Sequence, residues 1–450
     1  VLDALAAAGI SDPVVVEDGG ASDRRVAGGP DLRWGGARRI ANPDPSRGLA
    51  SSLHLGWAAA MASNPSPEAV LIVLGDQPAL DPVVIRRLMA EPADPFRPVV
   101  IARFSDGSRN PVRLEPGATD LVAAATGDRG LGPLLDARPG LIRVLDVNGG
   151  NPDIDDRADL VRLLADRWTD KVRGNAAQVE RFREEPDGPD FYASVSRTFI
   201  DDPGRRDDPV LAALLELVRP DDTWLDIGAG AGRYALPLAR HAREVVAVDP
   251  SPAMLAALTA GMAEHGIENL RALEGRWPPD PALRARLGRD PIADVALIAH
   301  VSYDIAEIVP FIEAMEQAAR RACTAILMDG SPASAAAPFW PIAHGQERIA
   351  LPALNQFVEL LEAGGRSPVV ELIRGERRRW QDPDELLRFL RRQVWTAPGT
   401  EADRRLVDAI PDLTRSARDG SVEVIALEPQ KIGVVTWEVP EVRAFGAGSV

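Results

Sequence analysis

The sequence has 450 residues, 45% of them hydrophobic, so two or three domains can each bury a core. The formal net charge of −16 argues against nucleic acids and anionic membranes as partners, because both are bound through basic surfaces. No apolar run is long enough to cross a bilayer, no signal-peptide pattern opens the chain, and the single cysteine excludes an internal disulfide. These features predict a cytoplasmic protein with no membrane and no nucleic-acid partner.

The first block of predicted elements covers residues 1–168. Apolar runs predict strands at Pro13–Glu17, Val70–Leu74, Pro98–Ala102 and Ile142–Asp146. Amphipathic patterns predict helices at Ser51–Met61, Pro82–Met89 and Asp156–Trp168. Because strands and helices alternate, we expect an α/β domain with a mostly parallel sheet covered on both faces.

A polar stretch over residues 169–190, with room for one helix at Ala176–Arg183, predicts a linker to a second block at residues 191–440. Strands are predicted there at Thr223–Ile227, Glu244–Asp249, Val295–Ala299 and Ala325–Asp329, before a helical stretch from Leu351 to Leu413. The runs Val422–Leu427 and Ile432–Trp437 predict a closing antiparallel hairpin. The fold class is therefore α/β, with two Rossmann-like domains.

The clearest pattern in the second block is an apolar strand that runs into three alternate glycines and then a helix. The glycines are Gly228, Gly230 and Gly232. Glycine lets a ligand approach the backbone and permits unusual backbone angles, and the helix start offers free N–H groups. The following strand ends at Asp249, where a carboxylate can accept both ribose hydroxyls of an adenosine.

A nicotinamide or flavin dinucleotide is the main rival ligand for this loop. Its Gly-x-Gly-x-x-Gly pattern fails when read from Gly228, but reading from Gly230 places a tolerated alanine at the third position. Asp226, two residues before the first glycine, favours a ligand with a cationic ammonium group over one with a pyrophosphate.

These residues resemble the first motif of class I S-adenosylmethionine-dependent methyltransferases, Asp/Glu-x-Gly-x-Gly-x-Gly, and the resemblance covers residues 191–437. It implies a seven-stranded sheet and S-adenosylmethionine as the cofactor. It also implies that the three glycines pack under this methyl donor, that Asp226 faces its methionine end and that Asp249 holds its ribose. Met254 would contact the adenine. Arg276 stands where the family often has an adenine-binding Asp, so Glu274 or backbone groups would substitute.

Polar and aromatic side chains follow the strand at Val295–Ala299, at the sheet edge where open α/β folds bind ligands. His300 could be a base or an acceptor contact, and Tyr303 could close over the donor, as could Phe191 and Tyr192. Simple packing would explain each of these side chains as well. Methyl transfer asks mainly for positioning and desolvation, so a base matters only for a protonated acceptor.

The first block resembles the molybdenum-cofactor nucleotidyltransferases, especially their cytidylyltransferase-like branch. The resemblance rests on segments that occur in the family's order: Asn42-Pro43, Gly48–Leu53, Leu74–Pro78, Arg109–Pro111, Gly127–Gly130 and Asp153–Asp156. It implies a nucleoside triphosphate at Ser51, Ser52 and Gly75. Asp76, at a strand's carboxyl end, can ligate a Mg²⁺ that bridges phosphate oxygens, with Asp155 or Asp153 as the second acid. Helix capping explains the serines equally well.

Two departures argue against nucleotidyl transfer by this block. The family's Gly-rich loop with its Arg and Lys has no counterpart, residues 1–170 contain no lysine, and Asn110 replaces a common histidine. Either the chain is a fragment, which its non-Met start favours, or the domain is a degenerate scaffold. We expect no nucleotide transfer, and pyrophosphate release from cytidine or guanosine triphosphate with Mg²⁺ would contradict this expectation.

Together the two resemblances predict a fused enzyme that methylates an unidentified small molecule. Two alternatives stay open. The first is Mg²⁺-dependent nucleotidyl transfer in molybdenum-cofactor maturation, which needs the missing loop. The second is a non-catalytic donor-binding sensor or scaffold, which would bind the donor without turnover on any acceptor.

Overall fold

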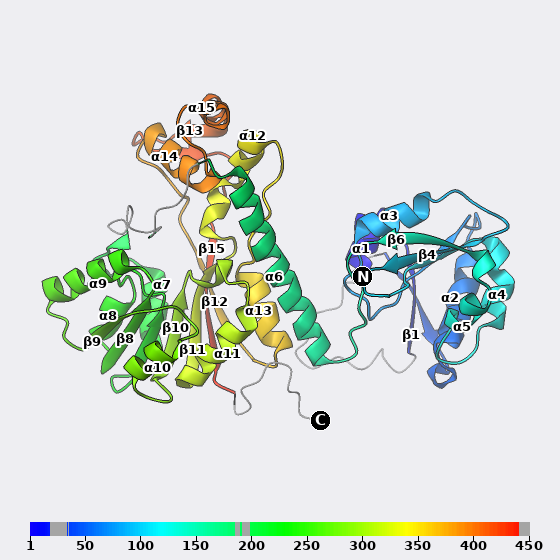
Figure 1. Ribbon diagram of the computed structural model, residues 1–450, viewed down its shortest axis with the longest axis horizontal. Coiled ribbons are helices and arrows are strands. Elements are labelled where there is room, and N and C mark those ends of the chain that lie inside the picture. Colours follow the sequence, from blue (N-terminus) through cyan, green and yellow to red (C-terminus); the bar gives the residue numbers. More distant parts are fainter. Residues whose placement is uncertain (19–33, 35, 185–189, 191–198, 441–450) are drawn as a thin grey trace. The chain divides into compact units, whose positions relative to one another are not determined.

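A computed structural model describes residues 1–18, 34, 36–184, 190 and 199–440 (Figure 1). The chain divides into two compact units, Val1–Asp156 and Arg157–Val450. The boundary therefore lies 12 residues before the one expected at residue 168, and the last predicted helix of the first block belongs to the second unit.

The first unit contains a four-stranded sheet in the order β3-β5-β4-β6 and a separate parallel pair, β1-β2. The strands are β1 (Val14–Asp18), β2 (Arg38–Asn42), β3 (Val70–Ile72), β4 (Val99–Phe104), β5 (Val112–Leu114) and β6 (Ile142–Val147). The helices are α1 (Leu2–Ala7), α2 (Leu49–Met61), α3 (Pro82–Ala90), α4 (Thr119–Ala124) and α5 (Gly132–Ala137). The sheet is mostly parallel as expected, since β3, β4 and β6 run in the same direction, but the short β5 inserts antiparallel between β3 and β4.

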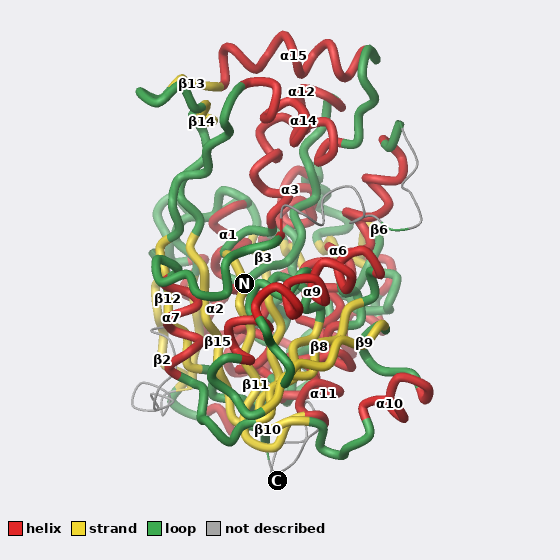
Figure 2. Tube along the Cα trace, turned by 90° about the vertical axis from the view of Figure 1, so that its left-hand side faces the viewer, coloured by secondary structure: helices red, strands yellow, loops and turns green. Residues whose placement is uncertain are grey.

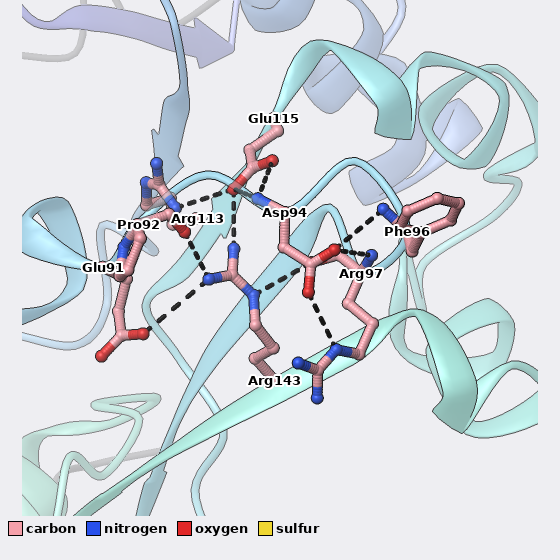
Figure 3. Close-up of polar contacts among 8 residues, drawn as sticks. All are labelled: Glu91, Pro92, Asp94, Phe96, Arg97, Arg113, Glu115 and Arg143. Carbon is pink, nitrogen blue, oxygen red and sulfur yellow. Dashed lines mark hydrogen bonds and ion pairs between the residues drawn. The ribbon is translucent and has the colours of Figure 1, made fainter.

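A buried ion network closes the end of this sheet at which β4 and β6 begin (Figure 3). The Glu115 carboxylate lies 3.0 Å from Arg113 Nη1 and 2.6 Å from Arg143 Nη2, and it also accepts the Asp94 backbone N–H. The Glu115 carboxylate thus has two guanidinium partners and a backbone donor within the fold, so removing either arginine would leave a buried charge with fewer partners.

The second unit is built on a sheet of seven strands, the number that the resemblance implies. Their order is β12-β15-β11-β10-β7-β8-β9. Its strands are β7 (Thr223–Ile227), β8 (Glu244–Asp249), β9 (Leu270–Glu274), β10 (Ala293–Ala299), β11 (Ala319–Met328), β12 (Val369–Arg374) and β15 (Lys431–Glu438). Only β15 runs antiparallel to its neighbours, and β7 lies inside the sheet between β8 and β10.

The antiparallel end of this sheet is confirmed, but its pairing differs from the predicted hairpin. β15 pairs with β11 and with β12, which interrupts the helical stretch expected from Leu351 to Leu413. The predicted partner segment forms β14 (Val422–Val424), which pairs with β13 (Thr414–Ser416) outside the main sheet. The sequence Val369–Arg374 mixes apolar and charged residues without a clean period, so it gave no strand signal.

Helices cover both faces of the seven-stranded sheet. One face carries α7 (Pro209–Glu216), α8 (Ala235–Ala239) and α9 (Pro252–His265). The other carries α6 (Arg157–Phe182), α10 (Pro281–Leu287), α11 (Ile308–Ala318) and α13 (Leu354–Ala363). Successive residues of a strand point to opposite faces, so Trp224 and Leu225 enter different cores. Burial on both faces explains why these strands read as continuous apolar runs.

Most of the expected linker is helical, because α6 continues 14 residues beyond Trp168. Trp168 and Val172 lie in the core of the second unit, and Trp168 Nε1 donates to the Ile305 carbonyl at 2.8 Å. Farther along, Gln178 Nε2 donates to the Glu347 carbonyl at 2.8 Å. One apolar residue every three or four positions is enough to bury a helix whose composition is otherwise polar.

A small helical subdomain gathers at one end of the second unit (Figures 1 and 2). It comprises a 3₁₀ segment at Pro332–Phe339, α12 (Trp340–His344), α14 (Pro383–Val394), α15 (Glu401–Leu413) and the β13-β14 pair, around a core of its own. The 3₁₀ segment follows the carboxyl end of β11, so the subdomain is joined to the edge of the sheet where the glycine loop lies. Within the described ranges no helix is long and apolar enough to cross a membrane.

Candidate active site

The predicted glycine loop follows the carboxyl end of β7, an interior strand of the sheet. All three glycines have positive φ, at +74° for Gly228, +56° for Gly230 and +88° for Gly232. A β-carbon on Gly228 would lie 2.5 Å from Val301 Cγ2, and one on Gly232 would overlap Leu258 and Leu236. At Gly230 the nearest atom would be Met254 Sδ at 3.9 Å, so only this glycine has space beside it. Two of the glycines therefore satisfy protein packing as well as loop geometry.

The Asp249 carboxylate joins the glycine loop to the turn that follows β8. Its Oδ2 accepts the Gly230 N–H at 2.8 Å, and its Oδ1 accepts the Ser251 N–H at 2.8 Å. Burial raises the pKa of this carboxyl, the two backbone N–H groups lower it, and the charge of Asp190 raises it. Each carboxylate oxygen keeps a lone pair, so the group can still accept hydroxyl donors from a ligand.

Asp190, which the sequence placed at the end of a linker, is a site residue that the pattern did not reveal. Its Oδ2 accepts the Ser251 hydroxyl at 2.7 Å and the Ala253 N–H at 3.2 Å, at the start of α9. It is 61 positions from Ser251, so no local spacing predicts the contact. Met254 is buried in the first turn of α9, and its N–H donates to Ser251 Oγ at 3.2 Å.

Glu274 lies at the carboxyl end of β9, paired in register with Asp249. Its side chain is exposed, and its backbone carbonyl accepts Arg286 Nη1 at 2.9 Å. Glu274 therefore lies at the same edge of the sheet as Asp249. Its role in place of an adenine-binding Asp stays a prediction.

Asp226 is the most unusual titratable group of the unit. Its side chain is 2% exposed, and its Oδ1 accepts no hydrogen bond from the residues that the structure describes. Burial, together with the nearby charge of Asp249, raises the pKa of the carboxyl to about 7. A buried carboxylate without a donor is costly, so it marks a place where a ligand cation would be stabilised.

His300 and Tyr303 meet at the end of β10, next to the glycine loop. His300 Nδ1 lies 3.2 Å from the Tyr303 hydroxyl, which accepts the Met328 N–H at 2.7 Å. His300 has a φ of +59°, a left-handed conformation that is uncommon outside glycine, and its N–H donates to the Ile326 carbonyl at 2.9 Å. Burial lowers the pKa of His300 to about 4 and raises that of Tyr303 above its usual value.

One arginine that the sequence analysis did not single out acts on His300 through its charge. Arg233, directly after the last glycine, pairs with Asp201 at 2.7 Å and with Asp208 at 3.3 Å. Its charge contributes to the low pKa of His300, while that of Asp208 opposes it. Phe191 and Tyr192, expected to close over the donor, lie outside the described residues.

In the first unit the structure brings Ser51 and Ser52 together with Asn42. Asn42 Nδ2 donates to Ser51 Oγ at 2.8 Å and to Ser52 Oγ at 3.0 Å, and Ser51 Oγ also donates to the Gly48 carbonyl at 2.8 Å. These hydroxyls are held in the first turn of α2, where they can meet a phosphate or serve the fold alone. Gly75 is exposed and has open space around it.

Asp76 follows β3 and has two acidic neighbours. Burial raises the pKa of its carboxyl, and the charges of Asp153 and Asp155 raise it further. The Ile154 N–H donates to the Asp76 carbonyl at 2.8 Å, which holds the two loops together. Among the described residues no group of three or more His, Cys, Asp or Glu side chains is arranged to hold a metal ion. Mg²⁺ commonly uses one or two carboxylates plus substrate phosphates, so the Asp76 and Asp155 pair stays a prediction.

Family comparisons assign both units. A MobA-like NTP transferase domain matches residues 1–141, and a methyltransferase domain matches residues 225–286. The second match begins inside β7 and covers the glycine loop, Asp249 and Met254.

Two sequence relatives are methyltransferases. The chain is 34% identical to protein-L-isoaspartate O-methyltransferase from Methanoregula boonei, over 28% of this chain and 60% of that protein. It is also 34% identical to ribosomal RNA small subunit methyltransferase A from Thermobifida fusca, over 25% of this chain and 37% of that protein. The crystal structure of the YcgJ protein from Bacillus subtilis is 15% identical, with a TM-score of 0.36 over 52% of this chain and 98% of that one. The chain thus spans less than two thirds of these sequence relatives, and it joins a MobA-like NTP transferase domain to a methyltransferase domain.

Proposed function

We propose that the second unit binds S-adenosylmethionine and transfers its methyl group to a small-molecule acceptor. The observation that carries the proposal is the buried Asp226 carboxylate, whose Oδ1 has no donor among the described residues. A ligand ammonium group would complete this carboxylate, whereas a pyrophosphate would be repelled by it. Bound S-adenosylmethionine supplies an activated methyl group, so this chain's residues need only bind, orient and desolvate the reactants.

The residues around the loop divide this task between the two ends of the donor. Asp226 faces the cationic end, while Asp249 accepts the ribose hydroxyls with the lone pairs that Gly230 and Ser251 leave over. Met254, beside Gly230, gives the adenine an apolar surface. The acceptor would enter beside His300, where Val301 packs against Gly228 and thus joins the two parts of the site.

Calorimetric titration of the full chain with S-adenosylmethionine and with S-adenosylhomocysteine tests this proposal directly. We expect both to bind, with the first compound turned over only when an acceptor is present. A parallel titration with NADH and FAD addresses the dinucleotide alternative. Binding of a dinucleotide with no heat from either sulfur nucleoside would refute the proposal, while donor binding without turnover on any acceptor would favour a sensor.

Two glycine variants separate donor contact from folding. Gly232→Ala puts a methyl group into Leu258 and Leu236, so we expect a destabilised domain with a melting transition several degrees lower. Gly230→Ala has space and only the cost of a left-handed alanine, about 1–2 kcal/mol. We therefore expect Gly230→Ala to fold but to bind the donor at least about tenfold more weakly, because its methyl group occupies ligand space. Unchanged binding by folded Gly230→Ala would show that the donor does not lie against this residue.

A second proposal concerns the first unit, which we infer to bind a nucleoside triphosphate with Mg²⁺ at Asp76 and Asp155. The observation that favours it is the placing of Asp76 near the charges of Asp153 and Asp155, whose loop is held to Asp76 by the Ile154 N–H. Binding is a better measurement than turnover, because residues 1–168 hold no lysine to grip a triphosphate.

Titration of cytidine and guanosine triphosphate with and without Mg²⁺ tests the nucleotide site. We expect Mg²⁺-dependent binding that Asp76→Asn weakens at least about tenfold, because one direct carboxylate ligand of the metal is lost. The exposed Asp146→Asn provides a control on a surface acid of the same unit. Equal binding with and without Mg²⁺, or equal affinity of both variants, would contradict a metal role for Asp76.

A further inference from the structure

The contact between His300 and Tyr303 determines which ring nitrogen of the histidine carries its proton. The Tyr303 hydroxyl accepts the Met328 N–H at 2.7 Å, and the one acceptor that the described residues offer to its own hydrogen is His300 Nδ1 at 3.2 Å. If Nδ1 donated instead, the buried Tyr303 hydroxyl would accept two hydrogen bonds, and its hydrogen would have no acceptor. Nδ1 is therefore the acceptor, and a neutral His300 carries its hydrogen on Nε2.

We propose that Tyr303 is a positioning residue that holds His300 as a neutral hydrogen-bond donor, with Nε2–H presented to the methyl acceptor. This inference rests on the proposed methyl transfer for its functional meaning. Among the described residues the structure gives Nε2 no hydrogen-bond partner, and His300 is only partly buried. Its backbone is left-handed, with a φ of +59°, a strained conformation of the kind that clusters at functional sites.

Burial is the main reason that the ring stays neutral, and neighbouring charges modify its effect on the pKa of His300. Arg233 lies on the glycine-loop side and disfavours a second proton, while Asp208 opposes this effect. Asp329 and Tyr234 act on Tyr303 and keep its hydroxyl protonated. With burial, these groups hold the pKa of His300 near 4, so the ring stays neutral throughout the physiological range.

This arrangement excludes His300 as the general base, because its basic nitrogen is occupied by the Tyr303 hydroxyl. The acceptor that suits such a site offers a lone pair to Nε2–H and a nucleophile that needs no deprotonation by His300. The sequence left a base and an acceptor contact as alternatives for this residue, and the hydrogen-bond pattern favours the contact.

Nitrogen-15 NMR of the full chain labelled in histidine tests the proposal without any ligand. His300→Gln assigns the signals among the five histidines. We expect His300 to show only the Nε2–H tautomer between pH 5.5 and 8, with no titration in that range. An Nδ1–H tautomer, or a midpoint between pH 6 and 7, would overturn the proposal.

Tyr303→Phe then tests the positioning role by removing only the hydroxyl. We expect a measurable Nδ1–H population to appear at His300, while the other histidine signals stay in place. A spectrum that stays purely Nε2–H in a folded variant would show that Tyr303 does not fix the tautomer. Neither result depends on donor binding, so failure of this inference is distinguishable from failure of the methyltransferase proposal.

Discussion

Asp226→Asn is expected to weaken binding of S-adenosylmethionine by at least about thirty-fold. The substitution keeps the shape of the side chain but removes the charge at the end of β7 that the proposed function assigns to the donor's ammonium group. Removing one partner of a buried charged contact costs about 2 kcal/mol or more, and 2 kcal/mol corresponds to that factor. Calorimetric titration at pH 8 measures it, with Asp222→Asn as the matched control, because Asp222 precedes the same strand but pairs with Arg321 outside the site.

The pH dependence of both affinity and stability should change in the same variant. The folded-state pKa of Asp226 is about 7, above its usual value, so the folded protein without ligand carries an extra proton between about pH 4 and 7. Its stability therefore falls as the pH rises through this window, by at most about 4 kcal/mol. Donor affinity should rise over the same window, because the ammonium group needs the ionised carboxylate.

Asp226→Asn has no proton to lose at this position, so its melting temperature should gain on that of the wild type as the pH rises from 5 to 8. The comparison between the two pH values removes the constant cost of burying an amide. The melting temperatures of the two proteins could instead change equally between pH 5 and pH 8, with the donor affinity of the variant unchanged. That result would show that the Asp226 carboxylate neither ionises at pH 8 nor faces the ligand.

The sequence predicted the glycine loop well because the residue patterns that indicate the loop are local. The strand limits Thr223–Ile227 and Glu244–Asp249 agree with the structure residue for residue, since a buried parallel strand is a continuous apolar run bounded by glycine or a charge. Positive φ at Gly228 could be predicted for the same reason, because the turn after a strand needs it.

Features that depend on distant parts of the chain escaped prediction. The six residues of β12 form a strand because β15 offers them an edge, and β15 is more than 50 positions away. The second half of α6, after Trp168, was predicted as a linker because its few apolar residues stabilise a helix only by packing in the second unit. Asp190 contacts Ser251 for tertiary reasons alone. Local propensity is a weak guide wherever tertiary packing decides.

Glu316→Gln is expected to destabilise the second unit by about 3–5 kcal/mol, the largest effect on folding that we predict. Glu316 is fully buried, and its Oε1 accepts Arg366 Nε and Trp437 Nε1, each at 2.9 Å, while its Oε2 accepts Arg366 Nη2 at 2.6 Å. The carboxylate thereby joins α11, the turn after α13 and β15. Glutamine removes the negative charge that Glu316 places against the buried guanidinium of Arg366 and turns an amide donor toward it.

Glu307→Gln is the matched control, because Glu307 pairs with Arg173 at 2.8 Å while both side chains are more than two-thirds exposed. The same chemical change there should cost at most about 1 kcal/mol, since water screens the pair and solvates each charge when the other is removed. Hydrogen exchange of peptides from α11, α13 and β15 measures both variants within the unit concerned, which a single melting transition of a two-unit chain does not. Equal protection in the two variants would mean that the buried triad contributes no more than a surface pair. Because Trp437 lies on β15, such a result would leave apolar packing alone to hold the antiparallel edge that completes the sheet beside the donor site.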